Sequence, residues 1–466
     1  MGFSDRKVAV GRHAKPQRGV RQPYIPRGGE GFFRFRLSWA AALAHAEAVI
    51  EVNTITITVL VALFALWNLD LIATLLNLTS LDPRLPAAFA EVYDADTYAR
   101  SQSYTRASAR FGVLHSTFSL ALLLVFWLLG GFGWLDGMAR SLVDGEVATG
   151  LVFIALLGLG SHLLNLPFSI YDTFILEGRF GFNKTTPRTF ALDQLKGVVL
   201  AAVLGAPLLA AILWIFSNVD QAWLWAWAVF TVFQLLLTYL APTFILPLFN
   251  KFAPMPEGEL KAAIRTMAER CDFPLTEIYI MDGSKRSTKA NAFFTGFGKR
   301  KKIALFDTLI AKQTTPELVA VLAHEIGHFK KKHIVQRIAV GVVQSAVIFF
   351  LLGLFTGQGE FARSLFNAFG VAKISPHVGL ALFGILFSPI SRLLGIATNA
   401  WSRKHEFEAD AYAAVAMQSP APLVSALKKL SAENLSNLTP HRLRVILDYS
   451  HPPVLQRLDA LQALAR

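Results

Sequence analysis

Long apolar runs dominate the pattern of hydrophobic and polar positions along this 466-residue chain. A helix needs about 20 mostly apolar residues to cross the hydrocarbon core of a bilayer. An amphipathic stretch from Leu37 to Val49, with His45 and Glu47 among its polar positions, is expected to lie at the interface or to extend the first span. The pattern predicts about seven transmembrane helices, at residues 54–78, 112–133, 149–170, 197–217, 222–245, 334–356 and 378–400.

Two polar segments lie outside these spans, at residues 250–333 and 401–466. In the first, helical periodicity runs from Glu257 to Cys271, and a second helix is expected from Glu317 to Lys332, with Thr315 as its N-cap and Pro316 at its start. Short strands are expected at 278–280, 291–294 and 302–306. We therefore predict an all-α polytopic membrane protein with a small α+β region, divided into a basic tail (1–36), spans one to five (37–249), the α+β segment (250–333), spans six and seven (334–400) and a helical C-terminal segment (401–466).

Composition supports a membrane protein and narrows the chemistry. The chain is 53% hydrophobic and 17% charged, whereas soluble domains carry about 25% charged residues. A single cysteine, Cys271, excludes an internal disulfide and any cysteine-based metal site. Nine Lys/Arg fall in the first 36 residues and fifteen between Lys251 and Lys332. In so apolar a chain such clusters flank membrane spans, so the expected partner is a lipid bilayer and not nucleic acid.

The second predicted helix carries a metal-binding pattern, His324-Glu325-Ile326-Gly327-His328. Residues four apart share a helical face, so both imidazoles can bind one ion, and Glu325 can act as general base. The alternative is a helix with two incidental histidines. An apolar run from Leu318 to Ala323 argues against it, because that run buries the helix and makes unpartnered polar groups costly.

A catalytic zinc takes three protein ligands and keeps one open position. Two spans separate His328 from the C-terminal segment, so the chain returns to the same side of the membrane. There, on a helix that continues the seventh span, Glu406 and Asp410 lie four residues apart on one face. Glu406 fits a ligand, and Asp410 fits an acceptor for a ligand imidazole. Glu408 and His405 are rival ligands, and a solvated charged helix face is the remaining alternative.

The chain resembles the type I CAAX prenyl endopeptidases, which are membrane zinc metalloproteases. The match runs from about Tyr98 to Leu461 and rests on more than the His-Glu-x-x-His pattern. It includes the segments Ser101 to Tyr104, Phe174 to Asn183, Pro247 to Phe252, Asp282 to Ser287, Asn291 to Phe294, Phe306 to Leu309, Glu406 to Tyr412, and His451 to Pro453 followed by Arg457.

The resemblance implies a gluzincin-like catalytic region with one zinc ion per chain, bound by His324, His328 and Glu406, and with Glu325 activating water. Asn291 and Ala292 are expected on an edge strand that pairs with the substrate backbone. His451 and Arg457 are expected near the developing oxyanion or behind the metal ligands. The resemblance also implies seven helices around a water-filled chamber, with the zinc site at its cytosolic end. Polar residues at membrane depth should then face this chamber or pair at helix interfaces: Asn68, Asp70 and His162.

Three functions fit the pattern. The first is a CAAX-type zinc endopeptidase that acts near the C-terminus of prenylated or membrane-associated peptides or proteins. The second is a membrane quality-control metalloprotease without prenyl specificity, and the third is a metal transporter. Richness in Ala and Arg favours a bacterial inner membrane over an endoplasmic reticulum. The positive-inside rule places segment 250–333 in the cytoplasm, although seven spans then leave the basic tail on the opposite side.

Overall fold

The computed structural model describes residues 50–295, 301–357 and 359–464, so the basic tail and the amphipathic stretch from Leu37 to Val49 lie outside the described residues. Six helical segments are long and apolar enough to cross a membrane, and a pair of helices bent by 54° makes a seventh span if it is counted as one. The six are α2 (Thr54–Thr79), α3 (Ala95–Leu128), α5 (Glu146–Ile170) with its continuation, α7 (Pro187–Asn218), α8 (Ala222–Leu240) with its continuation, and α13 (His333–Phe355). The bent pair is α15 (Pro376–Leu386) and α16 (Ser388–Ala416).

Several of these helices differ in extent from the predicted apolar windows. The second prediction, 112–133, was wrong at both ends, because α3 begins at Ala95 and stops before Gly130, whose left-handed backbone (φ 73°) separates it from α4 (Gly131–Leu142). Its polar first half was missed because hydropathy detects only the part of a helix that is apolar. Two spans continue through π-helical turns, η2 (Tyr171–Leu176) into α6 (Glu177–Arg179) and η3 (Ala241–Ile245) into α9 (Leu246–Phe249).

A four-stranded sheet forms the centre of the polar segment between α9 and α13. Its order is β1-β2-β4-β3, with β2 (Leu275–Met281) parallel to β4 (Lys301–Phe306) and the other pairs antiparallel. The three predicted strands correspond to β2, β3 (Ala292–Thr295) and β4, whereas β1 (Phe252–Pro254) was not predicted. Because β3 pairs only with β4 in this order, it is an edge strand.

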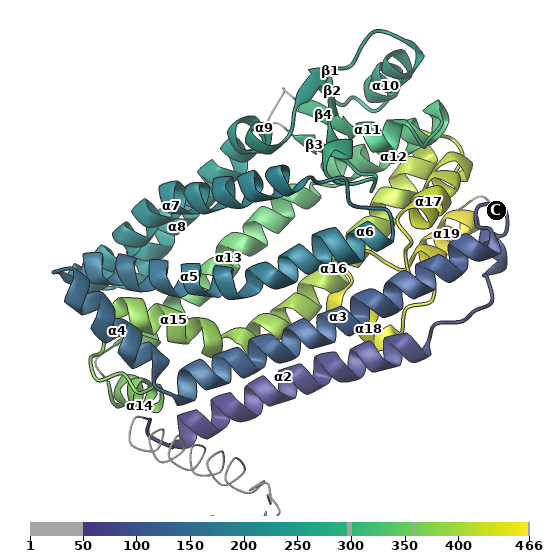
Figure 1. Ribbon diagram of the computed structural model, residues 1–466. Helices are drawn as coiled ribbons and strands as arrows, with labels where there is room; N and C mark the ends of the chain where they lie inside the picture. Colours follow the sequence, from purple (N-terminus) through teal and green to yellow (C-terminus); the bar gives the residue numbers. More distant parts are fainter. Residues whose placement is uncertain (1–49, 296–300, 358, 465–466) are drawn as a thin grey trace, which may run out of the picture.

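Helices surround the sheet and complete the fold. The predicted amphipathic helix is α10 (Glu259–Arg270), and the helix with the histidine pattern is α12 (Thr315–Lys330). The remaining elements are short: η1 (Ala87–Phe89), η4 (Gly283–Lys285), α11 (Asp307–Ile310), α14 (Glu360–Ala368), α17 (Ala421–Glu433), α18 (Arg442–Asp448) and α19 (Val454–Ala463). Figure 1 shows the sheet, α12, α17 and α19 at one end of the long helices and α14 at the other.

Buried side chains are concentrated at these two ends. One core joins α10, the sheet, α12 and the C-terminal helices around Ile264, Leu305 and Ile326, and another joins α3, α4 and α14 around Trp127 and Phe369. Along each of the six single membrane spans, by contrast, at most 17% of the most apolar stretch is buried inside the protein. The α+β end therefore has a buried core of its own.

The three polar residues singled out within the spans, Asn68, Asp70 and His162, have different surroundings. Asp70 of α2 accepts a hydrogen bond from Arg444 of α18 at 2.9 Å, which is the helix-interface pairing considered from the sequence. Asn68 donates to the carbonyl of Phe64 in its own helix, and His162 borders an apolar cavity of about 850 Å³ between α5 and α7. Asp70 thus ties the first span to the C-terminal segment.

Candidate metal centre

Helix α12 begins with a reciprocal cap. Its N-cap is Thr314, one residue before the predicted Thr315, and the Thr314 N–H donates to the Glu317 carboxylate at 2.8 Å. Glu317 also accepts hydrogen bonds from Ser425 and Lys429 of α17. Burial alone would raise the pKa of Glu317, but these donors outweigh it and hold the pKa below its usual range. The cap therefore fixes both the start of α12 and its attachment to α17.

Close packing of α12 on α16 brings the predicted ligands together. A Cβ on Gly327 would lie only 3.1 Å from the Cα of Ala409 and 3.2 Å from the Cβ of Tyr412. Only glycine permits so short an approach without displacement of α16. With the helices at this distance, one turn of α12 faces one turn of α16, and Glu406 is presented to the two histidines.

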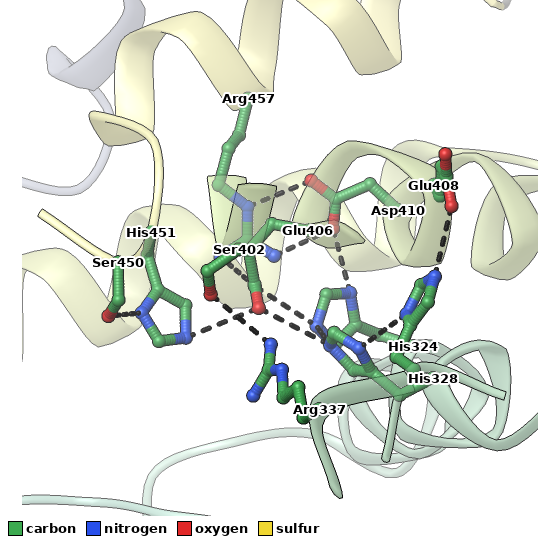
Figure 2. A network of polar contacts seen from close by, with 11 residues as sticks. His324, His328, Arg337, Ser402, Glu406, Glu408, Asp410, Ser450, His451 and Arg457 are labelled. Atoms are coloured by element: carbon green, nitrogen blue, oxygen red, sulfur yellow. Dashed lines mark hydrogen bonds and ion pairs between the residues drawn. The ribbon is translucent and has the colours of Figure 1, made fainter. Parts of the chain in front are cut away.

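Three ligand atoms converge on one point. The Nε2 atoms of His324 and His328 are 3.1 Å apart, and each is 3.4 Å from an oxygen of Glu406 (Figure 2). Zn–N bonds of about 2.0–2.1 Å in a tetrahedral site place ligand atoms about 3.3 Å apart. Among the described residues, these three form the group of His, Cys, Asp or Glu side chains placed to hold a metal ion. A buried set of two imidazoles and one carboxylate fits zinc.

The other ring nitrogen of His324 has its own partner. Nδ1 lies 2.8 Å from the Asp410 carboxylate, and Asp410 in turn accepts two hydrogen bonds from Arg457, at 2.6 and 2.8 Å. Burial opposes protonation of His324, but Asp410 and Glu406 outweigh it and raise its pKa to about 9. Both carboxylates are almost fully buried, so the guanidinium of Arg457 is needed to balance their charge.

Glu325 projects into a cavity beside this cluster. Burial raises the pKa of its carboxyl above the usual range, against the opposing effect of the two neighbouring histidines. The cavity has a volume of about 590 Å³ and also borders Asn291, Ala292, His451 and Arg457. It therefore brings together all the residues that the sequence singled out for catalysis or substrate binding, with the exception of Asp410, which lies behind His324.

Two family models match adjacent parts of the chain. Residues 75–251 match the model described as CAAX prenyl protease N-terminal, five membrane helices, and residues 254–465 match peptidase family M48. CAAX prenyl protease 1 of Saccharomyces cerevisiae is 37% identical over 407 residues, which cover 82% of this chain and 89% of the yeast protein. This chain belongs to the CAAX prenyl protease 1 family.

Relatives from other organisms and a solved structure agree. The CAAX prenyl protease 1 homologue of Homo sapiens is 33% identical over 82% of this chain and 89% of its own length. The crystal structure of S. mikatae Ste24p superposes with a TM-score of 0.81, at 34% identity, over 88% of this chain and 99% of that one. As a CAAX prenyl protease 1 homologue, the chain is a multi-pass membrane metalloendopeptidase, and the predicted fold class and activity are confirmed.

In this CAAX prenyl protease homologue, the two rival ligands lie outside the metal cluster. The Glu408 carboxylate is 3.0 Å from Nε2 of His333, and the His405 ring stacks on His333 with centroids 3.8 Å apart. His333 was not singled out from the sequence, although a third histidine five residues after His328 was visible there. It is 1% exposed, and its Nδ1 lies 2.9 Å from Nδ1 of His328.

Asn291 and Ala292 lie at the start of the edge strand β3, next to the cavity. Ala292 is the first residue of β3 and pairs with Leu305 of β4, which leaves the other side of β3 without a neighbouring strand in the sheet. Asn291 is exposed and borders the cavity beside Glu325. An extended peptide could add to this edge with a peptide bond next to the metal cluster.

Proposed function

We propose that this metalloprotease uses one zinc ion, held by His324, His328 and Glu406, to cleave peptide bonds near the C-terminus of prenylated or membrane-associated substrates. The observation that carries the proposal is the convergence of two imidazoles and a carboxylate beside a cavity that borders an edge strand. We take the proposed substrate class from the names of relatives that match more than four fifths of the chain.

A zinc ion at this position supplies Lewis acidity, which lowers the pKa of water and polarises a carbonyl oxygen. Glu325 accepts the proton of the attacking water and returns it to the leaving amine. The position of Glu325 suits both tasks, because its side chain borders the cavity beside the metal ligands. Asn291 and Ala292 position the substrate by hydrogen bonds between extended backbones.

His451 is placed to stabilise the oxyanion. Its side chain is 63% exposed, and its Nε2 lies 3.4 Å from an oxygen of Glu406, on the cavity side of the cluster (Figure 2). Arg457, by contrast, donates two hydrogen bonds to Asp410, and only its third nitrogen approaches Glu406, at 3.8 Å. Arg457 therefore supports the carboxylates, whereas the exposed side chain of His451 borders the cavity and is the better candidate to donate to substrate.

The catalytic end is placed on the cytoplasmic side of the membrane, and the composition of the chain favours a bacterial inner membrane. Fifteen Lys/Arg between Lys251 and Lys332 support this orientation. A quality-control protease without prenyl specificity shares the chemistry and remains the second candidate for substrate choice. A metal carrier is not supported, because its ligands would lie within the spans, whereas His324 and His328 lie on α12, outside them.

The proposal is tested with purified protein and three peptides: a farnesylated C-terminal Cys-aliphatic-aliphatic-X peptide, the same peptide without farnesyl, and an unrelated internal sequence. Mass spectrometry should detect cleavage near the C-terminus of the farnesylated peptide first. A chelator should abolish the cleavage, and added zinc should restore it. Equal cleavage of all three peptides would favour the quality-control function, and cleavage that survives metal removal would contradict the zinc mechanism.

A further inference from the structure

A line of contacts runs from the surface of α16 to a predicted zinc ligand. The Glu408 carboxylate lies 3.0 Å from Nε2 of His333, and Nδ1 of His333 lies 2.9 Å from Nδ1 of His328. The Nε2 of His328 is the atom that faces His324 and Glu406. His333 is 1% exposed, whereas the Glu408 side chain is 36% exposed.

Only one arrangement of protons along this line leaves His328 able to bind a metal. A metal-binding Nε2 must carry no proton, so the proton of His328 resides on Nδ1 and is donated. His333 Nδ1 must then accept it, which places the proton of His333 on Nε2. That proton is donated to Glu408, which as a carboxylate offers only acceptors. The reverse arrangement would put a proton on Nε2 of His328 and block the metal.

We propose that Glu408 and His333 form a positioning relay that fixes the tautomer and ring orientation of His328 and thereby sets the affinity of the site for zinc. The inference rests on the metal site of the proposed function. It gives a task to Glu408 and His333, neither of which contacts the predicted metal position. The second ligand imidazole, His324, is held by a different partner, Asp410, so the two histidines are oriented independently.

His333 also packs against aromatic rings, and this role must be separated from the relay. Its ring stacks on His405, which in turn lies 4.5 Å from the ring of Trp401. His405 is 2% exposed, and its Nδ1 has no hydrogen-bond partner within the described ranges. The two stacked histidines are therefore a matched pair in burial, and His333 is the one that contacts His328.

The experiment compares His333→Phe with His405→Phe in the full-length protein. Each variant keeps an aromatic ring in the stack. The dissociation constant for zinc is measured by competition with a chelator, and the melting temperature of the metal-free protein reports packing. His333→Phe should weaken zinc binding about 10- to 100-fold, as is usual for loss of a partner behind a metal ligand, and His405→Phe should not. His333→Asn, which retains an acceptor oxygen in place of Nδ1, should recover part of the affinity.

A second pair tests the outer end of the relay without altering the core. Glu408→Ala should weaken zinc binding in the same direction as His333→Phe. Lys404→Ala, which removes an exposed side chain 3.8 Å from Glu408, should have no effect. The relay is contradicted if His405→Phe weakens binding as much as His333→Phe, or if neither His333→Phe nor Glu408→Ala changes the constant. Glu406→Ala separates this failure from failure of the site: zinc binding that survives it would show that the metal is elsewhere.

Discussion

At the scale of single residues, the charges around the metal cluster are arranged in layers. Glu406 faces the predicted ion, Asp410 stands behind His324, and Arg457 stands behind Asp410. All three are nearly inaccessible to water, so each depends on its neighbour for compensation. His451 differs because its side chain is mostly exposed toward the cavity. The buried side chains therefore hold the site together, whereas the exposed His451 can contact the substrate.

The choice between Glu406 and its neighbour Glu408 leads to the first prediction. Glu406→Ala removes a ligand, so the zinc content of protein purified with excess zinc should fall well below one ion per chain. Glu408→Ala weakens the affinity but leaves the three ligands in place, so its content under the same conditions should stay close to one. Metal analysis of both variants decides the assignment. A loss of zinc confined to the Glu408 variant would reverse it.

His451 is the subject of the second prediction. His451→Ala should lower kcat about 100-fold or more, the typical loss of one oxyanion donor. Zinc content and melting temperature should change little, because the side chain is 63% exposed and its contact with the buried Glu406 is long, at 3.4 Å. Steady-state kinetics, metal analysis and a thermal melt are measured on one preparation. If the variant loses its zinc instead, His451 is structural, and Arg457 becomes the better candidate for the oxyanion.

At the scale of elements, the site depends on how α12 is held between α16 and α17. Gly327 sets the distance to α16, and Glu317 attaches the start of the helix to α17 through Ser425 and Lys429. The sequence predicted α12 and its two histidines because their spacing repeats within one helix. It did not identify the attachments, since Glu317 and Lys429 are 112 residues apart.

Other parts of the structure also divide into features that are local in the sequence and contacts between distant residues. The apolar length of the spans and the strand at 291–294 were predictable from local pattern, whereas the place of this strand at the sheet edge was expected only from the family resemblance. The contact between His333 and Glu408 spans 75 residues, and that between Asp70 and Arg444 spans 374. Neither follows from periodicity, because each depends on how separate helices pack. Of the residues behind the two ligand histidines, the sequence therefore identified Asp410, which shares a helical face with Glu406, but not His333.

The third prediction concerns the cap of α12. Glu317→Gln should lower the free energy of unfolding by about 1–3 kcal/mol, because three donors lose a charged acceptor. The pKa of Glu317 is depressed in the folded state, so its contribution is fully present above about pH 4.5, near the unfolded pKa. It is lost as the pH falls through the folded pKa.

The contribution of Glu317 is measured by denaturing the wild type and the Glu317→Gln variant at pH 7 and at progressively lower pH. The difference in the free energy of unfolding between the wild type and Glu317→Gln should become smaller as the pH is lowered. Ser425→Ala removes one donor but leaves the charge and Lys429 in place, and so should cost less than Glu317→Gln. A gap that stays constant down to strongly acidic pH would show that the carboxylate charge does not stabilise the helix start.

At the scale of the whole molecule, the catalytic end is a packed unit attached to sparsely buried membrane helices. Asp70 of the first span and Arg444 of α18 connect the two, and α18 leads directly into the segment that carries His451. We propose from the basic residues of this unit that it faces the cytoplasm.

Labelling from one side of the membrane tests this orientation and provides the fourth prediction. Cys271, the single native cysteine, is buried, whereas Glu269, near the end of α10, is exposed. A Glu269→Cys variant expressed in bacterial cells should react with a membrane-impermeant maleimide only after the inner membrane is permeabilised. Wild-type protein provides the background from Cys271. Labelling in cells with an intact inner membrane would place the catalytic end outside the cytoplasm.

The central claim, that water activated by Glu325 cleaves peptide bonds at a zinc ion held by His324, His328 and Glu406, is tested most directly by Glu325→Gln. The substitution removes the base and keeps all three ligands. Zinc content should remain near one ion per chain, while turnover of a peptide substrate should fall about 100- to 10,000-fold. Turnover close to that of the wild type, in protein whose zinc content has been confirmed, would contradict the account.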